Sequence, residues 1–506
     1  MRTRRTAELS STSLEGNRPV CGIVGHVSNS LVNQQIYDSL LLLQHRGQDS
    51  TGIATIEGNT VHRVKAKGLV REAYRTRDMR TLLGNVGLGH VRNANTPGAS
   101  QEDEVQPYYV NAPYGIVLVN NGNITNSREL TDELYRIDRR HLNSDSDAEL
   151  LLNVLANELQ HHIPDDGSDL TPEGIFSAVD GVHQRVEGSY ATIALIASRG
   201  LLAFRDPFGI RPLVLGHRLD EDGADEWVVC SESLVLTAGG YELVRDIAPG
   251  EAVWISTEGE MSSHTWDGPT RLVPCAFEYV YLARPDSVMN GVSVYGSRLR
   301  MGEKLAATVA EQIPVDEIDV IMPIPDSSRP SAMELARVLG IEYREGFLKN
   351  RYVGRTFIMP GQKVRKKTVR QKLNPMPVEF AGKRVLLVDD SVVRGTTSKE
   401  IIEMARNAGA AKVYLASAAP EVRYPHVYGI NIPTLDELVA TNRTVDEICE
   451  VIGADKLIYQ KVDDLYDAIV EGSDLTELDM SWCDGKYVTG TITDEYLHWV
   501  EDNRVS

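Results

Sequence analysis

The sequence predicts an α/β protein whose two halves are built differently: a sandwich of sheets between helices, followed by a doubly wound parallel sheet. Residues 21–258 alternate short apolar strands with turns, which is typical of antiparallel sheets. Beyond Pro274, periodic helices alternate with short apolar strands, the pattern of a parallel sheet covered by helices on both faces. The length of 506 residues suits two to three domains with independent cores.

In the first half, apolar runs predict strands at 115–119, 191–197 and 227–230, and helical spacing predicts helices at about 36–43 and 147–159. We expect this domain to span residues 21–258. It follows a segment, residues 1–20, that carries Arg2, Arg4, Arg5 and Arg18 and a Ser/Thr-rich middle but has no apolar core, and is therefore interpreted as a propeptide rather than a secretory signal.

In the second half, helices are expected at 298–311 and 331–339 and strands at 320–325 and 385–388, with a further helix near residue 400. We expect this domain to span residues 259–470. A C-terminal segment, residues 471–506, completes the chain.

The composition agrees with a globular, soluble, cytoplasmic protein. Hydrophobic residues make up 42% and charged residues 25% of the chain. No apolar run approaches the roughly 18 residues that a membrane span needs. A formal net charge of −20 argues against a general nucleic-acid binder, so any anion site must be made positive locally.

One such locally positive stretch lies between Lys349 and Lys372, where the cations include Arg351, Arg355 and Arg370 and there is no acid. Basic runs are usually solvated faces or, less often, nuclear signals. Here Gly354, Pro360 and Gly361 interrupt the run and favour a mobile loop, which would act as a lid over an anion.

The strand at 385–388 ends at two acids, Asp389 and Asp390, at the edge where open α/β sheets bind ligands. A loop of small and hydroxyl residues follows, and its backbone N–H groups, with the start of the next helix, can surround a phosphate. Acids at the end of a strand are by themselves common in such folds. The loop consists of Ser391, Val392, Val393, Arg394, Gly395, Thr396, Thr397 and Ser398.

This fourteen-residue string, 385–398, resembles the phosphoribosyl pyrophosphate (PRPP) loop of the type I phosphoribosyltransferases. The resemblance implies that the acids contact the ribose hydroxyls and that Ser391, Arg394, Gly395, Thr396, Thr397 and Ser398 grip the 5-phosphate. It also implies one Mg²⁺ per subunit, held by Asp389, Asp390 and Ser327. Lys349 and Arg351 would close on the pyrophosphate.

Four further strings carry a second resemblance: 21–27, 44–54, 89–92 and 120–123. Together they resemble the glutaminase domain of the class II N-terminal-nucleophile glutamine amidotransferases, in which a cysteine is the first residue of the mature chain. The resemblance implies a four-layer αββα sandwich. It also implies that the propeptide is removed, because the free α-amine of Cys21 is then the base that accepts the thiol proton.

In this reading Cys21 is the nucleophile, Asn121 and Gly122 form the oxyanion hole, Arg92 binds the glutamine α-carboxylate and Asp147 its α-ammonium. Each residue also has a simpler interpretation: a buried structural cysteine, a hairpin turn at Asn-Gly, and surface charges. The sequence after Arg92 is Asn93-Ala94-Asn95-Thr96, which departs from the family pattern by an apparent extra residue. The resemblance therefore does not specify which residues form this wall of the glutamine pocket.

The two domains occur together in the amidophosphoribosyltransferase family, and the similarity extends from Cys21 to about Tyr487. It implies glutamine hydrolysis, transfer of the ammonia to PRPP, and the first committed step of purine synthesis. It also implies an internal channel, a homotetramer and allosteric inhibition by purine nucleotides. A hexosamine-forming amidotransferase would lack the Asp389-Asp390 loop, and a PRPP-sensing regulator would have no use for Cys21.

The cysteines, Cys21, Cys230, Cys275, Cys449 and Cys483, contain no Cys-x-x-Cys pair, so neither a disulfide framework nor a zinc site is expected. One branch of the resembled family carries an iron-sulfur cluster on four cysteines. Here His426 stands where a second cysteine is expected and Cys483 is all that remains of the last cysteine-rich segment, so we expect no cluster.

Overall fold

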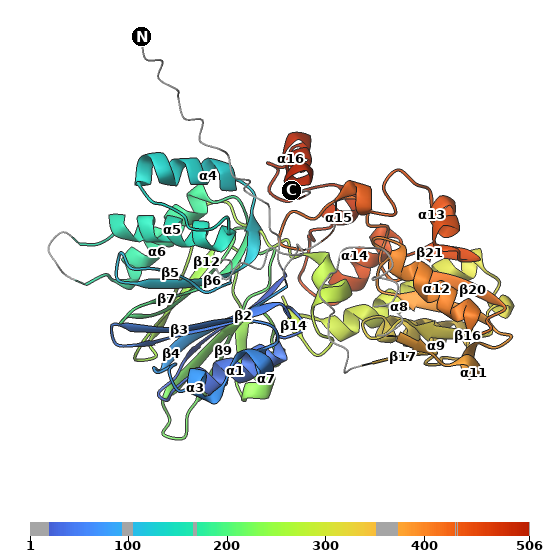
Figure 1. The fold of residues 1–506 in the computed structure, drawn as a ribbon, viewed down its shortest axis with the longest axis horizontal. Coiled ribbons are helices and arrows are strands. Elements are labelled where there is room, and N and C mark those ends of the chain that lie inside the picture. The colour runs from blue at the N-terminus through green and yellow to red at the C-terminus, as the bar shows by residue number, and fades with distance from the viewer. Residues whose placement is uncertain are drawn as a thin grey trace, which may run out of the picture.

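The computed structural model describes residues 20–93, 105–164, 169–350, 373–430, 432 and 434–504. They form two bodies that lie side by side, an all-antiparallel sandwich and a smaller body around a parallel sheet (Figure 1). No helix in these described ranges is long and apolar enough to cross a membrane.

The sandwich consists of two antiparallel sheets. The first has the strand order β11 (Glu242–Asp246), β9 (Val214–Leu219), β10 (Asp225–Cys230), β1 (Cys21–Val27), β4 (Val86–Arg92), β2 (Ser50–Glu57), β3 (Thr60–Lys67). The second has the order β13 (Met261–Thr265), β12 (Glu251–Ser256), β8 (Gly200–Arg205), β7 (Gly188–Ile196), β6 (Ile116–Ile124), β5 (Tyr108–Val110).

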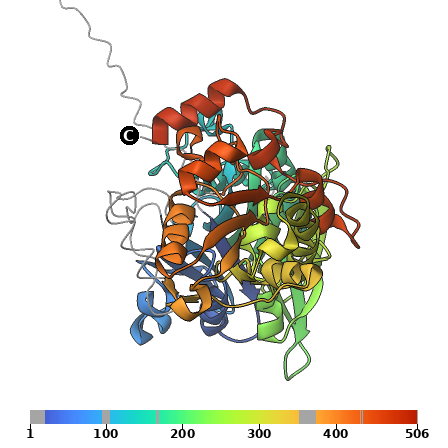
Figure 2. The same cartoon turned by 90° about the vertical axis from the view of Figure 1, so that its right-hand side faces the viewer.

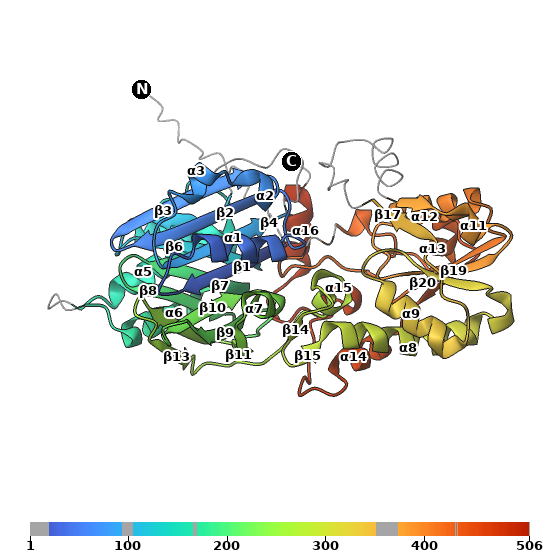
Figure 3. The same ribbon diagram turned by 90° about the horizontal axis from the view of Figure 1, so that it is seen from below.

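Three apolar layers hold the sandwich together. Between the sheets, Ile23 and Leu88 pack with Val119, Ile193 and Leu201. The outer face of the first sheet is covered by α1 (Asn33–Leu42), α2 (Val70–Ala73), α3 (Thr76–Met79) and α7 (Leu234–Gly239), and that of the second by α4 (Ser127–Glu133), α5 (Asp147–His161) and α6 (Pro172–Arg185). The αββα prediction is therefore confirmed, and Figure 3 shows the two sheets stacked.

The second body contains a parallel sheet of order β16 (Val320–Pro323), β19 (Arg384–Asp389), β20 (Lys412–Ser417), β21 (Lys456–Tyr459). Alternate residues of β19 face opposite sides, because side chains alternate along a strand. Leu387 packs on α12 (Thr396–Asn407) and α13 (Val445–Ile452), whereas Leu386 packs on α8 (Val294–Gln312) and α9 (Arg329–Leu339). Helices thus cover both faces, as predicted for a doubly wound sheet (Figure 2).

A third core lies where the two bodies meet. It joins η3 (Glu278–Leu282), the β14–β15 pair (Val288–Met289 and Val292–Ser293) and α14 (Val462–Val470) to the C-terminal α15 (Ser481–Asp484) and α16 (Asp494–Arg504). The fully buried Trp482 belongs to this core and contacts Phe277 edge to face. The C-terminal segment therefore packs between the bodies. The domain limits at 258 and 470 remain predictions, and β13, which follows residue 258, pairs with β12.

The shorter elements of the second body are η4 (Val315–Glu317), the pair β17 (Phe347–Lys349) and β18 (Leu373–Pro375), α11 (Pro377–Phe380) and η5 (Leu435–Glu437). In the sandwich, η2 (Leu134–Asp138) follows α4. The predicted helices and strands all occur, with ends that differ by a few residues. α6 was not predicted, although its Pro172 and the capping Thr171 are ordinary helix-start signals.

Two candidate active sites

Cys21 is the first residue of β1 and is fully buried. In the register of β1 and β4 it lies directly opposite Arg92. The preceding residue, Val20, is buried as well, and its carbonyl accepts a hydrogen bond of 3.2 Å from the Asn93 amide. Burial raises the pKa of the Cys21 thiol to about 12, although Arg92, Arg211 and Arg46 act in the opposite direction. With Val20 attached, the thiol is therefore protonated at neutral pH.

Arg92 and Asp147, both predicted to bind glutamine, line one small cavity together with Gly122. Gln106, Asn120, Ser146 and Ala148 complete its wall. Asp147 opens α5, and Ser146 caps this helix by accepting a hydrogen bond from the Ala148 amide. The Asp147 carboxylate also accepts a 3.0 Å hydrogen bond from the Ile124 amide, which fixes it at the end of β6. The structure thus brings the two predicted charges to one place.

Asn121 and Gly122 lie inside β6, paired with Ala191 and Tyr190 of β7, so the simpler interpretation as a hairpin turn is wrong. The Asn121 side chain is buried, and its Nδ2 has no hydrogen-bond partner within the described residues. A Cβ at position 122 would lie 2.0 Å from the Ser189 carbonyl oxygen, so only glycine fits there. A buried side-chain amide donor beside the backbone N–H of a glycine is an arrangement suited to an oxyanion hole.

The segment around Arg46 and Gly47 backs the site. A Cβ on Gly47 would lie 2.2 Å from the Arg92 nitrogen, so this close approach requires glycine. The Asn93 side chain accepts from the Gln48 amide at 2.9 Å and donates to the Arg46 carbonyl at 3.1 Å. The departure from the family pattern thus begins with a residue that ties the Arg46 segment to β4. Its remaining residues, 94–96, lie outside the described ranges.

The second site lies at the carboxyl end of β19, where Asp390 is bonded by two hydroxyls. Ser327 donates a short hydrogen bond to one of its oxygens, and Ser391 donates to the other at 2.7 Å. Burial and the charge of Asp390 raise the pKa of Asp389 well above its usual range, and burial raises that of Asp390. Two adjacent acids that resist ionisation, beside a hydroxyl, fit a divalent cation such as Mg²⁺.

The loop after these acids leads into α12. Gly395 has φ +71° and a Cβ there would lie 2.9 Å from Val439, so glycine is required for both reasons. Thr396 and Thr397 are exposed in the first helical turn, whereas the Ser398 side chain is buried, which leaves its backbone N–H for a phosphate. Arg394 is exposed and pairs with Glu437 at 3.1 Å, so its side chain is directed to that acid.

Lys349, at the end of β17, forms a 2.7 Å ion pair with Asp326, next to the proposed metal ligand Ser327. It is half exposed, so its ammonium group is accessible to a substrate. Arg351 and the rest of the predicted cationic lid up to Lys372 lie outside the described residues.

Comparisons with known proteins agree with both sites. Residues 92–238 match the model of a glutamine amidotransferase domain, and residues 298–426 match that of a phosphoribosyl transferase domain. Amidophosphoribosyltransferases of Pasteurella multocida and of Escherichia coli K12 are 54% and 51% identical to the chain, each over 96% of both proteins. A solved structure of the glutamine PRPP amidotransferase from B. subtilis, complexed with ADP and GMP, is 33% identical and superposes with a TM-score of 0.81, covering 94% of this chain and 98% of that one.

The chain belongs to the amidophosphoribosyltransferase family. The family resemblance, the fold class and the reaction predicted from the sequence are confirmed. The protein is an enzyme, a phosphoribosyltransferase with a glutamine amidotransferase domain, and the reaction is the glutamine-dependent amination of PRPP in purine biosynthesis.

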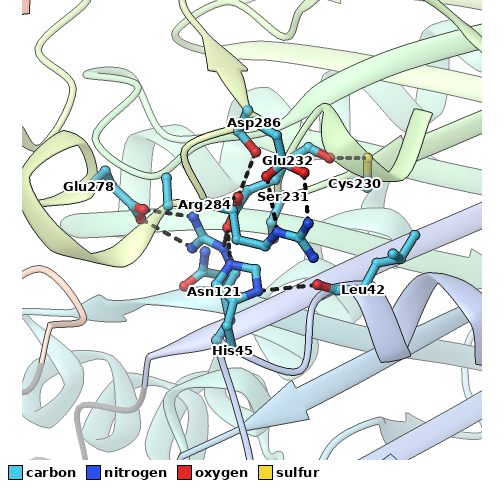
Figure 4. Close-up of polar contacts among 12 residues, drawn as sticks. Leu42, His45, Asn121, Cys230, Ser231, Glu232, Glu278, Arg284 and Asp286 are labelled. Carbon is cyan, nitrogen blue, oxygen red and sulfur yellow. Dashed lines mark hydrogen bonds and ion pairs between the residues drawn. The ribbon is translucent and has the colours of Figure 1, made fainter. Parts of the chain in front are cut away.

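One buried group of charges near Cys21 was not predicted. Arg46 donates to Glu278 at 3.2 and 2.7 Å and forms a short ion pair with Glu232, and Arg211 pairs with Glu278 at 3.0 Å (Figure 4). Arg46 occurs in one of the strings that carry the glutaminase resemblance, residues 44–54. Glu232 and Glu278 gave no sequence signal, because a single acid is not a motif.

Cys275 and His426, which the sequence predicted to lie where a cluster-binding relative has cysteines, form a group with Asp479. Cys275 Sγ lies 3.4 Å from His426 Nε2, which is itself 2.8 Å from the Asp479 carboxylate, and all three are buried. His426 Nδ1 accepts from the Tyr428 amide at 3.2 Å. The Cys483 thiol donates to the Met480 carbonyl. This donor set does not fit a cluster that needs four thiolates.

Proposed function

We propose that Cys21 releases ammonia from glutamine in the sandwich and that the Asp389-Asp390 site transfers it to C1 of PRPP, giving 5-phosphoribosylamine, glutamate and pyrophosphate. The observation that carries the proposal is the convergence at the first site. Arg92 of β4 is paired with Cys21 of the adjacent strand β1, and it lines one cavity with Asp147 and Gly122. Residues far apart in the sequence thus lie close together, which supports the proposed roles.

In the first half-reaction, the free α-amine of Cys21 takes the thiol proton and the sulfur attacks the side-chain amide carbon of glutamine. Arg92 binds the α-carboxylate and Asp147 the α-ammonium, so the amide is held over the sulfur. The Asn121 side-chain N–H and the Gly122 backbone N–H stabilise the tetrahedral oxyanion. The C–N bond then breaks, ammonia leaves with the proton, and water hydrolyses the thioester to glutamate and Cys21.

In the second half-reaction, ammonia forms the new bond to C1 while the C1–oxygen bond to pyrophosphate breaks. Asp389, Asp390 and Ser327 would hold one Mg²⁺, which neutralises the departing pyrophosphate when it is bound. The loop from Ser391 to Ser398 would grip the 5-phosphate, and the N-terminal end of α12 adds a favourable dipole. Lys349 and Arg351 would close on the pyrophosphate and exclude water.

The strand that carries the proposed oxyanion hole, β6, and its neighbour β7 contact the segment from Val427 to Gly429. Asn123 donates to the Val427 carbonyl at 2.8 Å, and Ser189 donates to the Tyr428 carbonyl at 3.0 Å. A Cβ on Gly429 would lie 2.9 Å from Gly122. β6 therefore contacts the second body at the residue proposed to stabilise the oxyanion. This supports an internal path for ammonia, which would be protonated and lost as a nucleophile in bulk water.

The partners and the location of the enzyme follow from the same assignment. Glutamine and PRPP are the substrates, and we propose feedback inhibition by purine nucleotides, supported by the relative from B. subtilis that was solved with ADP and GMP. We further propose a homotetramer in the cytoplasm and domain limits at residues 21–258 and 259–470.

The experiment that tests the mechanism concerns the amino terminus. A chain that begins at Cys21 is compared with one that begins with a single uncleaved alanine before Cys21, and intact mass confirms both. We expect glutamine-dependent synthesis only from the first chain and ammonia-dependent synthesis from both, because the alanine removes only the base. Normal glutamine-dependent turnover by the alanine-extended chain would overturn the proposed base.

A further inference from the structure

The structure assigns to Arg211 the role of a positioning residue for glutamine hydrolysis: it orients the side-chain amide of Asn121 so that its N–H groups face the oxyanion. This inference rests on the proposed role of Asn121 and adds to it the residue that holds the donor in place. Arg211 lies far from Asn121 in the sequence, in the loop that follows β8.

The contact itself fixes which end of the amide faces Arg211. The Nη2 atom of Arg211 donates to Asn121 Oδ1 at 3.3 Å. A guanidinium has donors and no acceptor, so the amide atom that it contacts must be the oxygen. The amide nitrogen is therefore turned the other way, and this nitrogen is buried and has no partner in the part of the chain that the structure describes. An unpaired buried donor is costly, which indicates that it is kept for a ligand.

Arg211 is itself held rigidly. Arg205, which is fully buried, donates to the carbonyls of Arg211 at 2.7 Å and of Gly209 at 2.6 Å. The Asp206 carboxylate accepts from the amides of Phe208 and Ile210 at 2.9 and 3.3 Å. In the loop that carries Arg211, backbone carbonyls thus accept hydrogen bonds from Arg205 and backbone amides donate to Asp206. A rigid support is what a preorganised oxyanion hole needs, because the donors must be in place before charge develops.

The positive charge of Arg211 is balanced by Glu278, which lies in the region that joins the two bodies. Glu278 of η3 forms an ion pair with Arg211 at 3.0 Å and also binds Arg46, which in turn pairs with Glu232. Two buried cations thus face two buried acids. Nη1 and Nε of Arg211 have no hydrogen-bond partner among the described residues, and the positive charge lies close enough to Cys21 to favour its thiolate.

A purely structural role for Arg211 makes a different prediction from a positioning role, so a double-mutant cycle separates them. The cycle uses Arg211→Met, Asn121→Ala and the double variant, with Arg211→Lys as the conservative variant. Three quantities are measured for each: kcat and KM for glutamine-dependent synthesis, and the rate with ammonium salt. The ammonia-dependent rate reports on folding, because it needs only the second site.

We expect Arg211→Met to lower the glutamine-dependent kcat by about 10- to 100-fold, somewhat less than the ~10²–10³-fold typical for loss of an oxyanion donor. The KM for glutamine should change by less than about threefold, since Arg92 and Asp147 are untouched. The ammonia-dependent rate should be unchanged. In the Asn121→Ala background, Arg211→Met should cost less than about a further twofold, and Arg211→Lys should recover part of kcat in the otherwise unmodified enzyme.

Three results would overturn the inference: an additive loss in the double variant, an unchanged kcat in Arg211→Met, or a parallel loss of ammonia-dependent synthesis. Because Arg211→Met leaves Glu278 with Arg46 as its remaining cation and can unfold the chain, Arg211→Met/Glu278→Gln, which removes both charges of the Arg211–Glu278 pair, repeats the cycle. Loss of ammonia-dependent synthesis there as well would make Arg211 structural. A normal kcat in Asn121→Ala alone would instead refute the proposed oxyanion hole, whatever Arg211 does.

Discussion

The two candidate active sites each contain a pair of buried acids, and the pKa values of the two pairs are shifted in opposite directions. At the first site Glu232 and Glu278 are fully buried, yet Arg46, with His45 at Glu232 and Arg211 at Glu278, outweighs the effect of burial and lowers the pKa of both carboxyls. At the second site burial and the charge of Asp390 raise the pKa of Asp389. Burial also raises the pKa of Asp390, because the hydroxyls of Ser327 and Ser391 and the charge of Arg298 do not compensate for it. The first pair is neutralised by the fold, whereas the second pair requires a cation from outside.

This difference teaches how to separate structural acids from functional ones. A buried carboxyl whose pKa is lowered has found its partner in the chain, and its removal chiefly costs stability. Two adjacent buried carboxyls whose pKa values are both raised, as at Asp389 and Asp390, make the folded protein less stable than it could be, and we infer that they are retained for a ligand. The same comparison predicts which variants lose one half-reaction and which lose both.

The largest expected effect is that of Cys21→Ala. Glutamine-dependent synthesis should fall by at least about 10⁴-fold, as expected for loss of a nucleophile, whereas synthesis from ammonium salt should remain near normal. The ammonia-dependent rate should rise with pH, since only neutral ammonia has the lone pair for attack. Pyrophosphate release with PRPP, Mg²⁺ and ammonium measures it. Loss of both activities in a folded variant would show that Cys21 also serves phosphoribosyl transfer.

The next largest effect is expected for Asp390→Asn, which should impair both activities and not only the glutamine-dependent one. Asp390→Asn should lower both glutamine- and ammonia-dependent synthesis by about 100-fold or more, because the cation and the ribose lose a charged ligand. Asp446→Asn, at an exposed position of α13, is the matched control and should be neutral. Synthesis is followed at saturating Mg²⁺ and PRPP. If ammonia-dependent turnover stays near normal in Asp390→Asn, the loop does not bind the substrate as proposed.

The second site could be predicted from the sequence almost completely, because Asp389, Asp390 and the loop to Ser398 are contiguous and only Ser327 and Lys349 come from elsewhere. The first site could be predicted only through family resemblance. Cys21, Arg92, Asn121 and Asp147 are brought together by strand register and by a helix start, and these depend on tertiary packing. Arg211 and Glu278 contact partners that lie far away in the sequence, so no spacing rule could have found them.

A smaller effect tests the geometry of the phosphate loop. Gly395→Ala should raise the KM for PRPP about tenfold, because alanine is strained at φ +71° and its Cβ would lie 2.9 Å from Val439. Gly453→Ala is the control: its φ is +79°, but nothing lies within 4 Å of the added Cβ. Both variants bear the backbone strain, and only Gly395→Ala moves the loop. Equal KM values for the two would mean that the loop adapts freely.

The smallest effect concerns the stability of the metal-free protein. Folding raises the pKa of Asp389 above its unfolded value, so folding disfavours the charged carboxylate. This penalty is absent below the ordinary carboxyl pKa of about 3.9, where both states are protonated, and grows as pH rises toward the folded pKa. Asp389→Asn removes the charge and keeps the oxygen that accepts the 3.0 Å hydrogen bond from the Asp390 amide.

Asp389→Asn should therefore stabilise the enzyme by about 1 kcal/mol at pH 8 in the presence of EDTA, a rise in Tm of about 2 °C, and by less at pH 5. Mg²⁺ should shrink the difference, because the cation binds and stabilises the unmodified carboxylates. Thermal unfolding of both proteins at the two pH values, with EDTA and with Mg²⁺, measures it. A variant that is less stable at pH 8, or whose gain is the same at both pH values, would show that Asp389 is already neutralised by the fold, and the contrast between the two sites would fail.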